Sequence, residues 1–263
     1  MELKGTVAIV TGSARGIGRG IATCLTREGV NVVVADLGQN ADIAKEMEET
    51  VRQAKAQGVE ALTVNVDVRD WDQVQGMVKA AIDRFGKVDI LVNNAGVISV
   101  AGVVGMEESE WDRVLGVNLK GTFLCTKAVA PHMMERRSGR IVNLSSQAGK
   151  RGHAFIAHYC TSKFGVIGFT QSVAQELGPF NVTVNAVCPG EVDTAMFRDV
   201  LAPAIAAARG LSVEEAWQDW IKTRVPLGRP QTAEDIGEAV VFLCRAENIT
   251  GEALNVTGGS EMN

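Results

Sequence analysis

The length, composition and charge of the chain leave few classes of protein open. Its 263 residues are 46% hydrophobic and contain no Pro/Gly/Ser-rich linker, which predicts one domain over residues 1–263 with a sizeable core. The net charge of −5 argues against nucleic-acid binding, which normally needs a basic surface. The first apolar run, Val7–Val10, is too short to span a membrane, and the five scattered cysteines indicate reduced thiols. We therefore expect a cytoplasmic protein without a membrane or nucleic-acid partner.

Short apolar runs alternate with helical patterns along the whole chain. Nearly continuous apolar runs are typical of strands buried on both faces of a parallel sheet. The predicted strands are Val7–Val10, Val30–Ala35, Ala61–Val66, Ile90–Val92, Arg140–Leu144, Val182–Val187 and Ala253–Val256. Between them, apolar stripes at helical spacing begin at Ile43 and at Trp71. This alternation predicts an α/β fold, a doubly wound (Rossmann-type) parallel sheet of about seven strands with helices on both faces.

A glycine-rich loop, Thr11–Gly18, follows the first predicted strand and opens a helix. Glycines there let the backbone approach a pyrophosphate, while amide N–H groups at the helix N-terminus point toward it. This context predicts dinucleotide binding. The candidate cofactor-binding residues of the loop are Gly12, Arg15, Gly16, Ile17 and Gly18.

The choice between NAD and NADP depends on two charged residues. Asp36 ends the second predicted strand, where a carboxylate can accept both ribose hydroxyls and would repel a 2′-phosphate. Arg15 favours the opposite choice, since a guanidinium can pair with that phosphate. Because Arg15 can swing into solvent, we predict NAD rather than NADP. Turns after the third and fourth strands suit the adenine edge and a wall along the cofactor; their candidate residues are Asp67, Val68, Asn94, Ala95 and Gly96.

Tyr159 and Lys163 are four residues apart and share one face of a predicted helix. Tyr159 is the only tyrosine in the chain. A lysine ammonium beside a phenol is expected to lower the phenol's pKa from about 10, so that it can exchange a proton with an alcohol near neutral pH. Ser146 lies thirteen positions upstream and can hydrogen-bond the same substrate oxygen.

These motifs, in this order, resemble the short-chain dehydrogenase/reductase family, of the compact single-domain type. The match runs from about Lys4 to Gly259 and includes T-G-x-x-x-G-x-G, N-N-A-G, a mid-chain Asn, S-x(12)-Y-x-x-x-K and a Pro-Gly followed by Thr. The resemblance implies that Tyr159 is the acid/base and that Lys163 lowers the tyrosine pKa and holds the nicotinamide ribose. It also implies a serine that orients the substrate oxygen. Both Ser145 and Ser146 are available, and the spacing selects Ser146.

The resemblance assigns roles to further residues. Asn118 matches the asparagine that anchors a proton-relay water near the lysine, although an Asn satisfying the backbone at a helix bend fits as well. The turn after the sixth strand is expected to meet the nicotinamide; its candidate residues are Pro189, Gly190, Val192 and Thr194. No metal is expected, because the three histidines lack ligand spacing with each other or with the cysteines.

The substrate side is predicted from polar residues near these motifs and from a helix-like segment at about 195–224, where the family places a substrate lid. Two permanently packed helices would fit that segment equally well. Glu191 departs from the apolar residue common after the Pro-Gly, and it either binds a hydroxyl or faces solvent. The candidate substrate-binding residues are Ser146, Gln147, His153, Tyr159 and Glu191. We predict an NAD-dependent oxidoreductase that acts on a small-molecule secondary alcohol, namely a polyol, sugar alcohol or small diol.

Two other functions and one assembly state follow from the same residues. A 3-oxoacyl-thioester (acyl carrier protein) reductase is suggested by Arg15 and Val225–Arg229, whereas Asp36 and the long lid argue against it. A non-catalytic NAD-binding protein would be expected to lose the tyrosine or the lysine. The helices around Glu110–Met134 and Ala157–Gly178 carry more apolar residues than one buried face needs, and the resemblance implies that they pair in a homotetramer.

Overall fold

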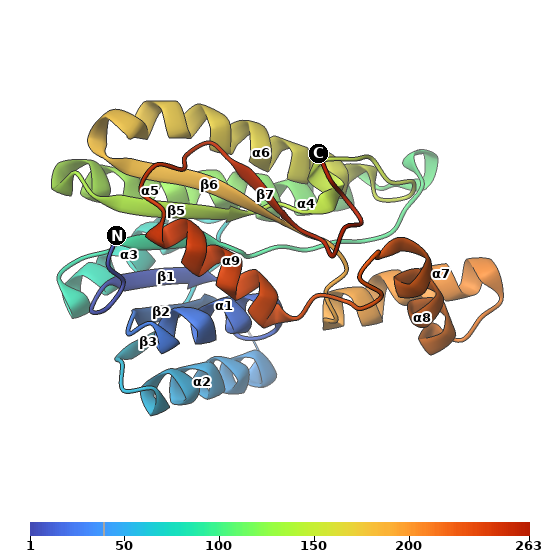
Figure 1. Cartoon of the computed structure of the whole chain (residues 1–263), viewed down its shortest axis with the longest axis horizontal. Coiled ribbons are helices and arrows are strands. Elements are labelled where there is room, and N and C mark those ends of the chain that lie inside the picture. Colours follow the sequence, from blue (N-terminus) through green and yellow to red (C-terminus); the bar gives the residue numbers. More distant parts are fainter. Residues whose placement is uncertain (39) are drawn as a thin grey trace.

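The computed structural model describes residues 1–38 and 40–263 (Figure 1). Within that part, seven strands form one parallel sheet in the order β3-β2-β1-β4-β5-β6-β7. The strands are β1 (Val7–Thr11), β2 (Asn31–Asp36), β3 (Ala61–Asn65), β4 (Ile90–Asn93), β5 (Gly139–Leu144), β6 (Val182–Pro189) and β7 (Ala253–Val256). Every predicted strand is confirmed, and the fold is a doubly wound, Rossmann-type sheet.

Helices cover both faces of this sheet (Figure 1). Ile21, Met47 and Ile236 bring α1, α2 and α9 into one apolar core with the sheet, whereas α3, α5 and α6 pack into the core on the opposite face. Both cores include fully buried residues of β1 and β2, which explains the nearly continuous apolar runs of these strands. The helices outside the lid are α1 (Gly16–Arg27), α2 (Ala41–Ala56), α3 (Trp71–Phe85), α4 (Glu108–Leu115), α5 (Gly121–Arg136), α6 (Ala157–Leu177) and α9 (Ala233–Arg245).

Short polar side chains fix where several helices begin. Asp70 accepts hydrogen bonds from the backbone N–H groups of Asp72 and Gln73 at the start of α3. Thr232 forms a reciprocal capping box with Asp235 at the start of α9. The α3 helix ends at Phe85 and is capped by Gly86, whose φ of 76° lies in the left-handed region that favours glycine.

The strand order changes direction beside β1. This strand pairs with β2 on one side and with β4 on the other, so the chain reverses its direction of winding at this point. In doubly wound sheets, ligands bind outside the carboxyl ends of the strands at such a point. The loops after β1, β4, β5 and β6 reach this edge, and they carry most of the predicted site residues.

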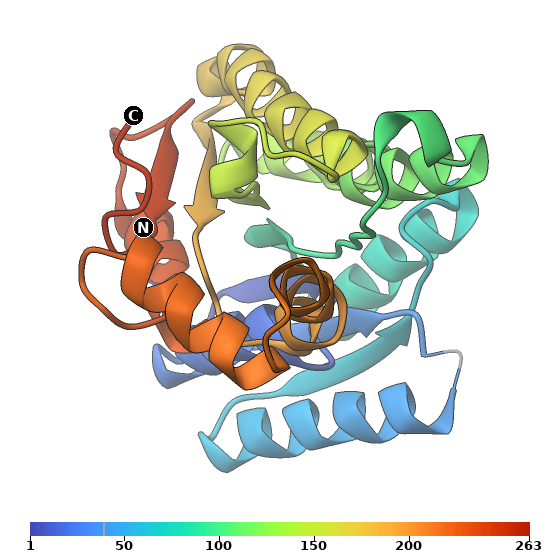
Figure 2. The ribbon, with the colours of Figure 1, turned by 90° about the vertical axis from the view of Figure 1, so that its right-hand side faces the viewer.

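Residues 195–224 form the predicted helical segment, which we call the lid after the role that the sequence predicts for it. It contains a π-helical turn at Phe197–Leu201 followed by α7 (Ala202–Arg209) and α8 (Val213–Arg224). Phe197 and Trp217 pack with their ring centroids 4.4 Å apart, inside an apolar cluster separate from the two sheet cores. The lid projects at one end of the molecule in Figure 1 and lies nearest the viewer in Figure 2. Among the described residues, no helix is both long and apolar enough to cross a bilayer.

Candidate active site

The loop between β1 and α1 has a backbone that only glycine accommodates easily. Gly12 and Gly16 have φ values of 65° and 57°, in the left-handed region. A Cβ at Gly18 would lie 2.1 Å from the carbonyl oxygen of Gly12. The α1 helix begins at Gly16, so its unpaired N–H groups face the loop. This cradle, which added side chains would fill, fits a dinucleotide pyrophosphate.

Side chains outside the predicted motif hold this loop in place. Arg19 donates from Nε to the carbonyl oxygen of Ala14 at 3.0 Å and to Thr50 Oγ1 at 2.9 Å. Asn94 donates from Nδ2 to the carbonyl oxygens of Thr11 and Gly12, both at 2.9 Å. Arg19 and Thr50 were not predicted from the sequence, because 31 residues separate them and neither belongs to the glycine pattern.

Asp36 lies against the glycine-rich loop. Its Oδ2 accepts the Ala14 backbone N–H at 2.9 Å, and its Oδ1 accepts that of Leu37 at 2.8 Å. Thr194 approaches the same loop, since its Cγ2 would be 3.7 Å from a Cβ built on Gly16. Although 22 residues separate Asp36 from Ala14 and Thr194 lies far along the chain, the fold brings them to one edge of the sheet.

The other predicted cofactor residues lie on neighbouring turns. Asp67 forms a 2.6 Å ion pair with Arg69, whose hydrogen bonds hold the pKa of the Asp67 carboxyl below its usual value. Val68 is buried, and a Cβ on Gly121 would lie 2.6 Å from its Cγ2. The Gly190 N–H, directly after Pro189, donates to the carbonyl oxygen of Val256 at 3.0 Å. Val192 is buried and forms a parallel bridge with Gln231.

Tyr159, Lys163 and Ser146 come together at the start of α6 and the end of β5. The Lys163 Nζ lies 5.6 Å from the centroid of the Tyr159 ring and donates to the carbonyl oxygen of Leu144 at 2.7 Å. The Ser146 hydroxyl lies near enough to the Tyr159 phenol to lower its pKa. Ser145 has a different partner, because its hydroxyl donates to the carbonyl oxygen of Lys163 at 2.8 Å. Of the two serines, it is therefore Ser146 that meets the tyrosine.

The charges of this cluster differ from the prediction in one respect. Burial raises the pKa of Tyr159 to about 12, and the nearby Ser146 hydroxyl only partly opposes this effect. Burial also lowers the pKa of Lys163 to about 8. The predicted lowering of the Tyr159 pKa by Lys163 is not seen in this structure, because desolvation disfavours the charged form of each side chain.

Asn118 lies in a π-helical turn, Gly116–Lys120, between α4 and α5, and it is 1% exposed. Its Nδ2 donates to the carbonyl oxygen of Val97 at 2.9 Å and to Ser162 Oγ at 3.0 Å, and its Oδ1 accepts the Val97 N–H at 2.8 Å. A Cβ on Gly96 would lie 3.5 Å from Asn118 Oδ1 and 3.7 Å from Lys163 Nζ. Asn118 thus holds the turn after β4 close to the lysine.

On the substrate side, Glu191 does not face solvent. It is 3% exposed, and its Oε1 accepts hydrogen bonds from Gln147 Nε2 at 2.8 Å and from Trp220 Nε1 at 3.1 Å. The solvent-facing alternative for Glu191 is therefore wrong. Ser260 Oγ lies 3.1 Å from Glu191 Oε2 and 2.9 Å from Gln147 Oε1. Trp220 and Ser260 were not predicted as parts of the site.

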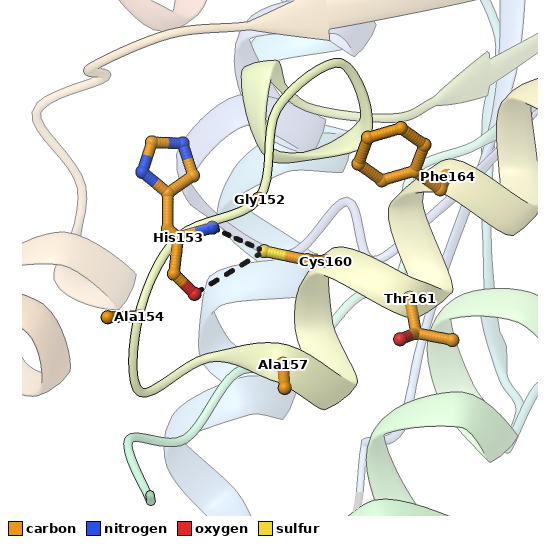
Figure 3. Close-up of a pocket in the computed structure, with 7 residues that line it drawn as sticks. All are labelled: Gly152, His153, Ala154, Ala157, Cys160, Thr161 and Phe164. Carbon is orange, nitrogen blue, oxygen red and sulfur yellow. Dashed lines mark hydrogen bonds between the residues drawn. The ribbon is translucent and has the colours of Figure 1, made fainter. Parts of the chain in front are cut away.

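His153 lies on the segment that connects the Ser146 turn to α6. Burial lowers the pKa of its imidazole, and its Nε2 is buried without a hydrogen-bond partner among the described residues. Its backbone N–H donates to Cys160 Sγ at 3.3 Å (Figure 3). A pocket opens here on α6; its lining residues are Gly152, His153, Ala154, Ala157, Cys160, Thr161 and Phe164.

Comparisons with known proteins agree with this geometry. A family model described as short chain dehydrogenase matches residues 6–204. The 3-oxoacyl-(acyl-carrier-protein) reductase FabG of Staphylococcus aureus is 40% identical over 257 residues, which are 97% of this chain and 98% of that protein. Galactitol 2-dehydrogenase of Agrobacterium fabrum is also 40% identical, over 265 residues that cover 100% of both chains.

A solved structure gives the same result for the fold. NAD+-bound xylitol dehydrogenase has a TM-score of 0.89 and 31% identity to this chain, covering 98% of it and 100% of the other chain. The glycine cradle and the cluster of Tyr159, Lys163 and Ser146 occur in a chain that these comparisons match over nearly its full length. The chain belongs to the short-chain dehydrogenase family.

Proposed function

We propose that the protein is an oxidoreductase that transfers a hydride between NAD(H) and a secondary alcohol or ketone, and that its substrate is a polyol, sugar alcohol or small diol. The observation that carries the reaction type is the meeting of Tyr159, Ser146 and Lys163 at the sheet edge that also holds the glycine cradle. The similarity to galactitol 2-dehydrogenase and to xylitol dehydrogenase supports the substrate class.

Each site residue has a separate role in the proposed reaction. When bound, the nicotinamide supplies or accepts the hydride. Tyr159 and Ser146 hydrogen-bond the substrate oxygen, and the phenol takes up or returns the hydroxyl proton. The Lys163 ammonium, one helical turn away on the same face, favours the phenolate when Tyr159 gives up its proton. The residues that would hold the cofactor include Gly12, Gly16 and Gly18 at its pyrophosphate.

The preference for NAD over NADP is supported by the position of Asp36. Its carboxylate lies on the glycine-rich loop and accepts the Ala14 N–H, so a 2′-phosphate on the adjacent ribose would meet a fixed negative charge. Arg15 is exposed. Asp36→Ala should lower the ratio of kcat/KM with NAD to kcat/KM with NADP. Arg15→Ala removes the opposite charge from the same loop and should not lower this ratio.

A polyhydroxylated substrate is supported by the polar groups around Ser146. His153 Nε2 is buried without a hydrogen-bond partner among the described residues, and an aliphatic ligand would leave it unpaired at a cost of about 1–3 kcal/mol. The lid, residues 195–224, is proposed to cover this side and exclude water. The five cysteines are all buried free thiols, which supports the expectation of a reducing, cytoplasmic environment.

A panel of substrates tests the proposal. The reduction of NAD and NADP should be followed with sorbitol, galactitol, 2,3-butanediol and 2-butanol, and the oxidation of NADH and NADPH with a 3-oxoacyl thioester. We expect a polyol or diol with NAD to exceed 2-butanol by at least about tenfold in kcat/KM. Equal rates with 2-butanol, or the highest activity on the thioester, would contradict the proposed substrate.

The thioester reductase is the second candidate because a specific observation favours it. The 40% identity to FabG equals that to galactitol 2-dehydrogenase, and Arg15 lies in the loop where it could meet a 2′-phosphate. Activity with NADPH and an acyl thioester that exceeds all alcohol oxidation would favour this candidate. No turnover with any of these substrates would favour a non-catalytic NAD-binding protein instead.

A further inference from the structure

Glu191 joins three segments that lie far apart in the sequence. Its Oε1 accepts hydrogen bonds from Gln147, directly after Ser146, and from Trp220 of α8. Its Oε2 lies 3.1 Å from the hydroxyl of Ser260, in the segment after β7. A carboxylate that is only 3% exposed is stable only if such donors surround it. Glu191 therefore holds the turn of Ser146, the lid and the C-terminal segment around one buried group.

Polar contacts of this kind connect the lid to the turn of Ser146. The apolar cluster of the lid, which includes Phe197, Trp217 and Ile221, is separate from both cores of the sheet. Trp220 lies at the edge of that cluster, with the Arg224 guanidinium 3.8 Å from its ring centroid. The indole N–H of Trp220 connects this edge directly to Glu191. Loss of the hydrogen bond between Trp220 and Glu191 would detach this part of α8 from the turn of Ser146.

The same group also fixes the orientation of Gln147. The Gln147 amide nitrogen donates to Glu191, and its amide oxygen lies 2.9 Å from Ser260 Oγ. Both ends of the amide are therefore occupied by protein partners. Since Gln147 directly follows Ser146, its orientation also restricts the position of the turn that presents the serine hydroxyl to the substrate.

We infer that Glu191 is a positioning residue: it fixes α8 and the turn of Ser146 relative to each other and so assembles the substrate side of the site. Only the expected change in kcat/KM rests on the proposed function. The structural consequence, protection of α8 against local opening, can be measured on the protein without substrate.

Three variants distinguish a positioning role of Glu191 from a direct effect of its charge on the substrate. Glu191→Ala removes the acceptor of all three partners, and Trp220→Phe removes only the N–H of the lid. Glu191→Gln keeps an oxygen for Gln147 and Trp220 and offers an N–H group to Ser260 Oγ. Trp111→Phe is the matched control, because Trp111 lies on α4, outside this cluster, and is 36% exposed.

Hydrogen exchange of the α8 amides and steady-state kinetics are the two measurements. Glu191→Ala and Trp220→Phe should speed exchange in α8 by at least about fivefold, whereas Glu191→Gln and Trp111→Phe should stay within about twofold of wild type. Glu191→Ala should also lower kcat/KM for the best polyol at least about tenfold and leave the Kd of NADH unchanged. Glu191→Gln should retain most of the wild-type kcat/KM.

Two results would overturn the inference. Unchanged exchange in Glu191→Ala would show that the carboxylate does not hold the lid. A kinetic defect in Glu191→Gln as large as in Glu191→Ala would show that the charge itself acts, as in direct contact with substrate. If wild type oxidised no alcohol, the proposed function would fail, and the exchange of α8 would still decide the role of Glu191.

Discussion

At the scale of single residues, burial decides how the catalytic cluster behaves. Lys163 is buried and Tyr159 is half-buried, and desolvation raises the pKa of Tyr159 to about 12 and lowers that of Lys163 to about 8. The phenol therefore remains protonated over most of the pH range and is suited to donate its proton. In the proposed oxidation of an alcohol, Tyr159 would take up a proton instead, and the charge on Lys163 would favour the phenolate that this requires.

The role of Tyr159 is testable by removing one oxygen atom. Tyr159→Phe should keep the fold and the affinity for NAD, because the ring remains and only the proton-transfer group is lost. Turnover should fall by about two to four orders of magnitude, since general acid/base catalysis and part of the oxyanion stabilisation disappear. Thermal unfolding and NADH titration serve as controls for the fold. Substantial remaining activity would assign the proton transfer to another residue.

Lys163 should make the stability of the cofactor-free protein depend on pH. Its pKa is about 8 in the folded state and 10.5 as an ordinary side chain. Between these values the unfolded chain holds a proton that the folded chain has released, so raising the pH through this window favours folding. The free energy of unfolding of wild type relative to Lys163→Met should rise by up to about 3 kcal/mol across it.

Urea denaturation of wild type and Lys163→Met, below pH 8 and near pH 10.5, measures this difference. Tyr159 is present in both proteins, so its titration contributes to both curves and largely cancels from the difference. A difference that does not change with pH would mean that the lysine is not desolvated.

At the scale of elements, the packing of α1 against the first loop decides whether the cofactor cradle can form. Gly18 lies in α1, and its missing side chain lets the helix approach the carbonyl oxygen of Gly12. Asn94 closes the same place from the turn after β4. Two elements and a loop thus meet where a single methyl group would not fit.

Gly18→Ala should disrupt this contact. Its Cβ would lie 2.1 Å from the Gly12 carbonyl oxygen, so either the loop or α1 must shift, at about 1–3 kcal/mol of stability. The Kd of NAD should rise by at least about tenfold, equivalent to about 1.4 kcal/mol. Thermal unfolding and calorimetric titration measure the two effects.

Gly76→Ala provides the matched control for this change. Gly76 lies in the exposed interior of α3, where a Cβ would meet nothing within 4 Å. The substitution should therefore stabilise the protein by about 0.5–1 kcal/mol and leave NAD affinity unchanged. Wild-type affinity in Gly18→Ala would show that the cradle tolerates the methyl group.

At the scale of the whole molecule, the surface of α5 and α6 suggests assembly. Several apolar residues of these two helices, including Val129 and Val166, are buried within the subunit. Phe123 and Phe164 remain 43% and 46% exposed, and Phe123 packs edge-on against Phe169 with ring centroids 6.3 Å apart. We propose that this face pairs with a second copy in a homotetramer.

Analytical ultracentrifugation at micromolar concentration tests the assembly. Wild type should sediment as a tetramer, and Phe164→Asp should form smaller species, because a charge in the paired face would be desolvated. Leu211→Asp changes a residue that is 38% exposed in the lid and should remain tetrameric. A monomeric wild type would contradict the proposal.

The sequence alone determined the features that depend on local patterns. Nearly continuous apolar runs predicted all seven strands, although the edge strands β3 and β7 are only partly buried, and a glycine-rich turn between a strand and a helix predicted the cradle. The spacing of Tyr159 and Lys163 along one helix also placed them on a common face, because helical geometry fixes the direction of neighbouring side chains.

Only the tertiary structure decided the properties that depend on distant segments. Glu191 contacts Trp220 and Ser260, which are 29 and 69 residues away in the sequence, and no local sequence pattern predicts such contacts. The direction of the Tyr159 pKa shift was likewise not predictable, since it depends on how much water the folded chain excludes. Spacing fixes which side chains share a helix face, whereas burial and long-range hydrogen bonds arise only when separate elements pack together.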